Sequence, residues 1–223
     1  MSHNVDIVFC IDCTGSMSPV LDASKKLALG FQEVLDKALK EQQKSIDALR
    51  VKVIAFRDYY CDGEASMSES RFFDLPAETV DYAAFVNNLN PEGGGDEPEC
   101  ALEAFALAMR SDWSSSPGRK RRIVCILTDA SAHPLEKAAI GAPIGYPSDL
   151  PKSLSELADI WEGEMDDKAR RLLVFAPETY PWNKICPDDQ GGFSDAIHYP
   201  SRGGAGLSDV DYNQIVSLVA NSI

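Results

Sequence analysis

The sequence predicts an α/β fold: a doubly wound, mostly parallel central sheet flanked by helices, with one short antiparallel edge strand. Apolar runs rich in β-branched residues, such as 5–11 and 121–127, are typical of strands buried on both faces of a parallel sheet. Amphipathic helical segments alternate with these runs, which favours right-handed crossovers between parallel strands. No repeat, low-complexity segment or linker interrupts the pattern, so we expect one domain spanning 1–223.

The first half of the chain predicts a central strand, a long helix and an edge hairpin. Residues 5–11 form the first strand, and from 20 to about 44 apolar residues recur at three- and four-residue steps, which predicts an amphipathic crossover helix. Residues 49–56 alternate in polarity and predict a second strand with one wetter face. We expect 57–70 to be a polar loop and 71–75 to be a short strand antiparallel to the second.

The second half continues the alternation of strands and helices. We expect helices at 79–89, 99–113, 154–168 and 209–222, and strands at 121–127, 171–176 and, more weakly, 195–199. Residues 128–151 hold four prolines and two glycines, too many for a regular element. This segment is therefore predicted to be a long loop of the functional kind.

Composition and charge exclude several classes of function. With 21 basic and 35 acidic residues the formal charge is −14, which disfavours nonspecific binding to nucleic acid or to anionic membranes. The apolar runs are far shorter than the ~20 residues of a membrane span. The first residues lack a basic segment, so we expect no secretory signal, a cytoplasmic location, free thiols for the six cysteines and a monomer.

Oxygen-bearing side chains follow two of the predicted parallel strands. Asp12, Thr14 and Ser16 come after the first strand, and Thr128 and Asp129 come after the strand at 121–127. Ligands of such folds bind at the carboxyl ends of the strands, so these side chains are candidates for one site. Hydroxyl and carboxylate oxygens suit a hard cation such as Mg²⁺.

Three motifs resemble one known family. Asp12-Cys13-Thr14-Gly15-Ser16 resembles the D-x-[ST]-x-S motif of the metal-ion-dependent adhesion site in von Willebrand factor type A domains. Residues 127–129 resemble the strand-end aspartate of that site, and the glycine-rich stretch 93–99 resembles its third element. The resemblance implies Mg²⁺, with Mn²⁺ or Ca²⁺ as alternatives, held by the hydroxyls of Thr14 and Ser16 and, directly or through water, by Asp12 and Asp129.

The third element departs from the family pattern. Many members have a threonine after the paired glycines, where this chain has Gly95 and then Asp96. If Asp96 contacts the ion, three carboxylates surround a charge of +2 and the site repels an acidic partner residue. If Asp96 only orients Ser16 or a water, the site stays receptive. The sequence leaves both arrangements open.

The resemblance implies a divalent-dependent protein interaction module, not an enzyme, whose ion completes its coordination with an oxygen from a partner, often a carboxylate. The G-G-G-D-x-P-E sequence, with 57–59 and His133, resembles bacterial and alpha-kinase-linked modules more than extracellular adhesion domains. That similarity suggests a kinase, phosphatase or chaperone component as partner in bacterial stress signalling. The second hypothesis is a Mg²⁺-dependent phosphohydrolase using the same site, although the D-x-D-x-T nucleophile pattern would need aspartate at Thr14.

Four further residues form a candidate partner-binding rim around the site. They are Arg57, Asp58, His133 and Tyr146. We expect Arg57 and Asp58 to pair and brace the loops, and His133 either to contact the partner or to fix its own loop. Tyr146 belongs to the long loop that would select the partner.

The motif residues also have a purely structural interpretation. Aspartate, threonine and serine are favoured in turns and helix caps, but caps alone do not require a matched second aspartate at Asp129. For Glu97 and Glu99 we favour this simpler role, as acidic residues in the first turn of the following helix.

Overall fold

The structure, a computed structural model, describes residues 2–95, 97–186, 193–205, 207–208 and 210–223 of the chain. Its centre is a seven-stranded mixed sheet in the order β3-β2-β1-β5-β6-β7, with β4 also paired to β2. The strands are β1 (Ser2–Asp12), β2 (Ser45–Phe56), β3 (Met67–Glu69), β4 (Phe73–Leu75), β5 (Lys120–Leu127), β6 (Arg170–Pro177) and β7 (Ala196–Ser201). All neighbours are parallel except β3 and β4, which run antiparallel to β2.

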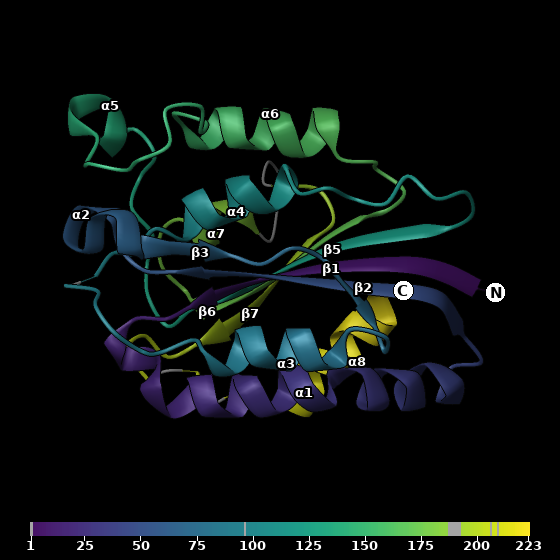
Figure 1. Cartoon of the computed structure of the whole chain (residues 1–223). Coiled ribbons are helices and arrows are strands. Elements are labelled where there is room, and N and C mark those ends of the chain that lie inside the picture. The colour runs from purple at the N-terminus through teal and green to yellow at the C-terminus, as the bar shows by residue number, and fades with distance from the viewer. Residues whose placement is uncertain (1, 96, 187–192, 206, 209) are drawn as a thin grey trace.

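Helices cover both faces of the sheet. They are α1 (Ser18–Glu41), α2 (Tyr59–Asp62), α3 (Thr79–Asn87), α4 (Ala101–Met109), α5 (Lys137–Gly141), α6 (Leu154–Glu164), α7 (Trp182–Ile185) and α8 (Tyr212–Ser222), with 3₁₀ turns η1 (Gly15–Met17) and η2 (Gly63–Ser66). Figure 1 shows α1, α3 and α8 on one face and α4 and α6 on the other. The mostly parallel α/β sandwich predicted from the sequence is therefore confirmed.

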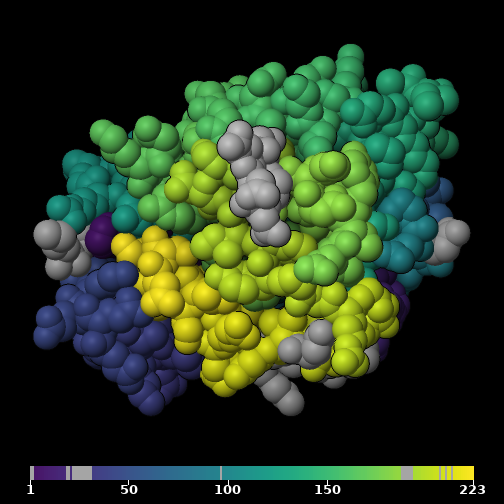
Figure 2. Space-filling view, turned by 180° about the vertical axis from the view of Figure 1, so that it is seen from behind, coloured from purple at the N-terminus to yellow at the C-terminus, as the bar shows by residue number. Residues whose placement is uncertain are grey.

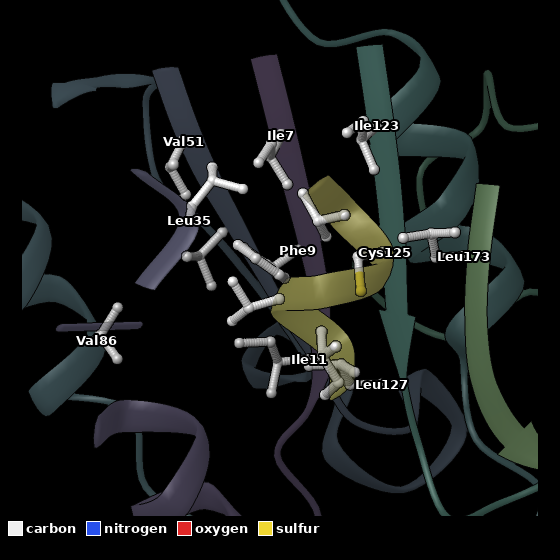
Figure 3. Close-up of a cluster of buried hydrophobic side chains, with 14 of the residues drawn as sticks. Ile7, Phe9, Ile11, Leu35, Val51, Val86, Ile123, Cys125, Leu127 and Leu173 are labelled. Atoms are coloured by element: carbon white, nitrogen blue, oxygen red, sulfur yellow. The ribbon is translucent and has the colours of Figure 1, made fainter. Parts of the chain in front are cut away.

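The central position of β1 follows from its two apolar faces. Ile7, Phe9 and Ile11 point into a buried cluster with side chains of α1, α3 and α8, which Figure 3 shows in close-up. Val8 and Cys10, which alternate with them, pack in a second cluster beneath α4 and α6. Because both faces of β1 are buried from Val5 to Asp12, the strand lies between β2 and β5 instead of at an edge.

Two segments predicted to be irregular contain short elements. The loop expected at 57–70 holds α2, η2 and β3, because the Asp58 side chain accepts a hydrogen bond from the Tyr60 amide and β3 then pairs with the end of β2. The loop expected at 128–151 holds α5, a single turn whose five residues contain no proline. Short local elements of this kind depend on single caps and pairings, which hydrophobic periodicity does not report.

Several predicted helices are shorter than expected. The first helix ends at Glu41, α4 covers only Ala101–Met109, and α6 ends at Glu164. The terminal helix starts at Tyr212, with the Asp211 side chain accepting a hydrogen bond from the Asn213 amide. No helix in the described part of the chain is long and apolar enough to cross a membrane.

Candidate metal centre

The carboxyl ends of β1 and β5 bring the two predicted motifs together. Ile11 is paired with Leu127 in the parallel register, so the residues that follow the two strands leave the same edge of the sheet. Asp12 and Asp129 are almost completely buried there, with 0% and 1% of their surfaces exposed. Buried carboxylates need hydrogen-bond partners, and the neighbouring hydroxyls supply them.

Asp12 is held through both of its oxygens. Its Oδ1 accepts hydrogen bonds from the Thr14 amide at 2.9 Å and from Thr14 Oγ1 at 2.6 Å. Its Oδ2 accepts a hydrogen bond from Thr128 Oγ1 at 2.7 Å. The sequence placed Thr128 at this edge, but its part in orienting Asp12 emerges only from the structure.

Ser16 connects the first motif to the second. Its Oγ donates to Asp129 Oδ1 at 2.9 Å and lies 3.3 Å from Thr14 Oγ1. Asp12, Thr14, Ser16 and Asp129 therefore form one continuous hydrogen-bonded group, although Asp129 is 113 residues from Ser16. Asp96, the fifth predicted member, lies outside the described residues.

The glycine-rich loop closes over this group because it carries no side chain at a critical point. Gly94 has a φ of +63°, and a Cβ added there would lie 2.8 Å from both Thr14 Cγ2 and Glu99 Oε1. The Gly94 amide donates to Asp62 Oδ2 at 2.9 Å, and the Gly15 amide donates to the Gly93 carbonyl at 3.4 Å. Only glycine fits this left-handed, crowded position.

Glu99 is a site residue that sequence reasoning missed. The helix that was expected to start at Glu99 starts at Ala101, because backbone hydrogen bonds hold Glu99 in an extended bridge to the segment after β5. These bonds run from the Glu99 amide to the Ser131 carbonyl and from the His133 amide to the Glu99 carbonyl. The first-turn acid of α4 is instead Glu103, and Glu97 accepts a hydrogen bond from the Ser131 amide.

The Glu99 carboxyl group is buried beside the hydroxyl and carboxylate group. Glu99 is 5% exposed, and its Oε2 has no hydrogen-bond partner among the described residues. It lines a hollow of about 330 Å³ together with Thr14, Ser16, Gly94 and Asp129. The available signal was the position of this glutamate inside the third motif, directly after Glu97-Pro98.

Burial and neighbouring charge act on the protonation of the site. Burial raises the pKa of Asp12 to about 6, although the hydrogen bonds from Thr14 and Thr128 oppose the shift, and Asp129 adds to it. A negative charge on Asp12 is therefore unfavourable at this buried position unless a positive charge lies beside it.

The same effects are larger at Glu99. Burial, followed by the charges of Asp12, Asp58, Asp62 and Asp129, raises the pKa of Glu99 to about 9. Glu99 consequently carries a proton at neutral pH, and the carboxyl groups around the hollow repel one another when they ionise. A divalent cation is the kind of ligand that such a group accommodates.

Three observations test whether the residues fit a hard cation. The donors are oxygens, the buried Glu99 Oε2 lacks a partner in the described chain, and Gly94 leaves room where a side chain would block the hollow. Across the described residues, no group of three or more histidine, cysteine, aspartate or glutamate side chains is arranged to hold a metal ion. The candidate site differs from such groups because two of its donors, Thr14 and Ser16, are hydroxyls.

Arg57 braces the site, but not through the predicted partner. Its guanidinium donates to the backbone carbonyls of Cys13, Ala65 and Asn90. The expected Arg57–Asp58 pair is therefore wrong: carbonyl groups from three segments converge on the guanidinium, while the Asp58 side chain turns inward. Arg57 still ties the first motif to the loops beside it.

Asp58 and His133 form a buried pair. Asp58 Oδ1 lies 3.2 Å from His133 Nε2, and both residues are buried. Burial alone would raise the pKa of Asp58, but the Tyr60 amide, Cys61 and His133 outweigh it and lower that pKa. The His133 ring also packs edge-on against Tyr60. The Lys137 ammonium lies 3.6 Å from the Tyr60 centroid and 3.1 Å from His133 Nδ1. Of the two roles considered for His133, this geometry favours fixing the loop.

The long loop after β5 is anchored at one point and exposed at others. Tyr146 Oη donates to Glu103 Oε1 at 3.0 Å, and its ring packs against Tyr59. Ile140 and Ile144 are 91% and 83% exposed. Figure 1 shows α5 projecting at the same end of the sheet as α2.

The comparison with known families agrees with this architecture. The chain matches the model of the von Willebrand factor A domain over residues 6–139, more than half of its length. The protein therefore belongs to the von Willebrand factor A domain family.

One curated relative is the alpha-protein kinase vwkA of Dictyostelium discoideum. It is 28% identical over 135 residues, which are 60% of this chain and 20% of that protein. The chain thus spans about a fifth of the relative, and kinase activity is a property of the relative. The match is in line with the expected likeness to alpha-kinase-linked modules.

Solved structures share the fold at low identity. The pilus adhesin SpaC of Lactobacillus rhamnosus GG aligns over 98% of this chain and 30% of its own, with a TM-score of 0.53 and 10% identity. Proximal thread matrix protein 1 of the mussel byssus aligns over 98% of this chain and 46% of its own, with a TM-score of 0.50 and 14% identity. These likenesses concern the fold alone.

Proposed function

We propose that this protein is a divalent-cation-dependent protein interaction module rather than an enzyme. One observation carries the proposal: hydroxyls and carboxylates of two distant motifs converge on one hollow, beside a buried Glu99 oxygen without a partner in the described chain. Membership of a family whose domains commonly bind proteins, often with a metal ion, supports it.

In this proposal Asp12, Thr14, Ser16 and Asp129 hold Mg²⁺, with Mn²⁺ or Ca²⁺ as alternatives, and Asp96 lies at or beside the ion. When bound, the ion would supply a coordination position for an oxygen of the partner, such as a carboxylate. The hydroxyl protons of Thr14 and Ser16 are donated to Asp12 and Asp129, which leaves the oxygen lone pairs of both hydroxyls for a cation.

The surrounding residues would keep this arrangement rigid and present it to the partner. Thr128 holds the second oxygen of Asp12, and Arg57 fixes the loops on either side. Exposed Ile140 and Ile144 would add apolar contact area at the rim. A partner with an acidic residue next to apolar side chains fits both features.

The cellular setting is a further part of the proposal. The alpha-kinase relative supports a partner from a kinase-linked signalling system, with a phosphatase or chaperone component as the other candidates. A bacterial stress system and a cytoplasmic location remain predictions from the sequence.

Thermal unfolding in EDTA and in millimolar Mg²⁺ or Mn²⁺ tests the metal site. An ion at ~100 times its Kd contributes about 2.7 kcal/mol, which raises the Tm of a chain of this size by roughly 5–10 °C. We expect this shift in the wild type and its loss in Asp12→Ala. Because Asp12 is buried and its loss could impair folding, Ser16→Ala is the milder second variant.

Asp159→Ala, a change of the same type at an exposed position on α6, is the control and should keep the full Mg²⁺ shift. Equal melting temperatures with and without the ion in the wild type would contradict the metal site. Turnover of a generic phosphoester that disappears in Asp12→Ala would contradict the binding-only role and favour the phosphohydrolase hypothesis.

A further inference from the structure

A second pocket lies at the end of the sheet opposite the candidate metal centre, where β1 and β5 begin. Its volume is about 440 Å³. Side chains from three separate segments line it: His3 of β1, Arg119, Lys120 and Arg121 at the start of β5, and Asp166 and Lys168 before β6. At the left of Figure 2 the start of β1, in purple, lies beside teal atoms of the segment that leads into β5 and near the yellow end of α8.

The charge of this pocket is opposite to that of the whole protein. Its basic side chains are Arg119, Lys120 and Arg121 at the start of β5 and Lys168 before β6. Asp166 is the one carboxylate in the lining, in a chain of net charge −14. Asp166 is engaged locally, since its Oδ1 accepts a hydrogen bond from the Lys168 amide. Lys120, Arg121 and Lys168 form no ion pair with any residue that the structure describes. Their charge is thus left for a ligand.

Arg121 is held in place before any ligand binds. Its Nε donates to the Ser222 carbonyl, and its Nη1 donates to the Lys120 and Lys168 carbonyls. Burial, followed by repulsion from Arg171 and Arg119, lowers the pKa of Arg121. An anion would relieve this repulsion, and the fixed guanidinium would lose little conformational freedom on binding it.

His3 supplies an independent indication of a ligand. It is 5% exposed, lines the pocket, and its Nδ1 is buried without a hydrogen-bond partner in the described part of the chain. Burial and then the charges of Arg121, Arg119 and Lys44 lower the pKa of His3. A buried polar atom without a partner is costly, and an acceptor oxygen in the pocket would satisfy it.

We propose that the pocket formed by His3, Arg119, Lys120, Arg121 and Lys168 binds a phosphate group. A phosphate monoester carries a charge of about −1.5 to −2 at neutral pH and three strong acceptor oxygens. Cationic donors from two segments, together with an imidazole from a third, match these acceptors better than they match a single carboxylate. The pocket is separate from the candidate metal centre, which lies at the carboxyl ends of the same strands.

The experiment uses the three histidines of the chain as reporters. Imidazole NMR signals are followed through a pH titration in EDTA, with inorganic phosphate or with sodium chloride at equal ionic strength. Bound phosphate favours the charged imidazole, so the apparent pKa of His3 should rise by roughly one unit. His198, whose Nε2 lies 2.8 Å from the Ala176 carbonyl on β6, is the internal reference. Its NMR signals should be the same in phosphate and in chloride.

The double variant Lys120→Gln/Lys168→Gln should weaken phosphate binding about fivefold or more. Lys152→Gln/Lys184→Gln removes the same charge from exposed positions outside the pocket and should bind phosphate like the wild type. O-phosphoserine is the second probe. If it binds more tightly than inorganic phosphate, the ligand is a phosphorylated side chain; if it does not, the ligand is free phosphate. A His3 titration that is the same in phosphate and chloride, or unchanged by the pocket variant, would overturn the proposal.

Discussion

At the scale of single residues, the candidate metal centre depends on a few positions where only one type of side chain fits. Thr14 and Ser16 each donate a hydroxyl proton to a buried carboxylate. Gly94 lies against Thr14 and Glu99 with no room for a Cβ. The hollow therefore depends on the absence of a side chain at Gly94 and on the short polar side chains of Thr14 and Ser16.

Replacing Gly94 with alanine should destabilise the protein. Alanine at a φ of +63° is strained, and its Cβ would lie within 3 Å of Thr14 and of Glu99. We expect the free energy of unfolding to fall by at least about 1 kcal/mol, as measured by urea denaturation, and the Mg²⁺-induced rise in Tm to shrink.

Gly163→Ala is the matched control. Gly163 is exposed on α6, and a Cβ there would meet nothing within 4 Å. This change should stabilise the protein by about 0.5–1 kcal/mol, because glycine is unfavourable inside a helix. If both glycine variants were equally stable, the crowding at Gly94 would not matter.

At the scale of elements, isolated backbone and side-chain contacts connect segments that have no regular pairing. The bridge at Glu99 fastens the glycine-rich loop to the segment after β5. Tyr146 fastens the far end of that segment to α4 through Glu103, which is 1% exposed. The long loop is thus held at both ends, and exposed Ile140 and Ile144 lie between these two attachments.

The burial of Glu103, which accepts the Tyr146 hydrogen bond, should make stability depend on pH. Burial raises the pKa of Glu103 to about 7, although the Tyr146 hydrogen bond opposes the shift. From about pH 4.5 to 7 the unfolded chain loses this proton while the folded chain keeps it, so stability falls as pH rises and then levels off. Glu103→Gln cannot ionise and should not show this fall.

The free energy of unfolding of Glu103→Gln relative to wild type should therefore increase over that interval, by at most about 3 kcal/mol. Urea denaturation at several pH values measures it. Glu164→Gln, at an exposed position on α6, is the control and should give a difference that is flat with pH. A flat difference for Glu103→Gln as well would contradict the protonated state assigned to Glu103.

At the scale of the whole molecule, one sheet joins two buried clusters. The faces of β1, β5 and β6 contribute side chains to both clusters, so neither helical layer can detach without exposing the sheet. The two candidate sites lie at opposite ends of the same strands. That the chain forms one domain over 1–223 stays a prediction from the sequence.

Unfolding should accordingly be a single cooperative transition. Trp161 and Trp182 are buried in the cluster beneath α4 and α6 and report on that layer by fluorescence, whereas far-UV circular dichroism reports on both layers. We expect the two urea curves to coincide. Separate midpoints would indicate that the layer of α1, α3 and α8 unfolds independently.

The sequence by itself determined the alternation of the long strands and helices and the group formed by Asp12, Thr14, Ser16 and Asp129. These follow from local periodicity and from the rule that parallel strands end at one edge of a sheet. Their binding of a metal ion stays a prediction.

Only the tertiary structure decided the burial of Glu99, the carbonyl partners of Arg57, the Asp58–His133 pair and the basic pocket around His3. Each of these depends on contacts between segments far apart in the chain. No local pattern encodes such contacts, because desolvation and charge at a residue are set by whatever folds against it.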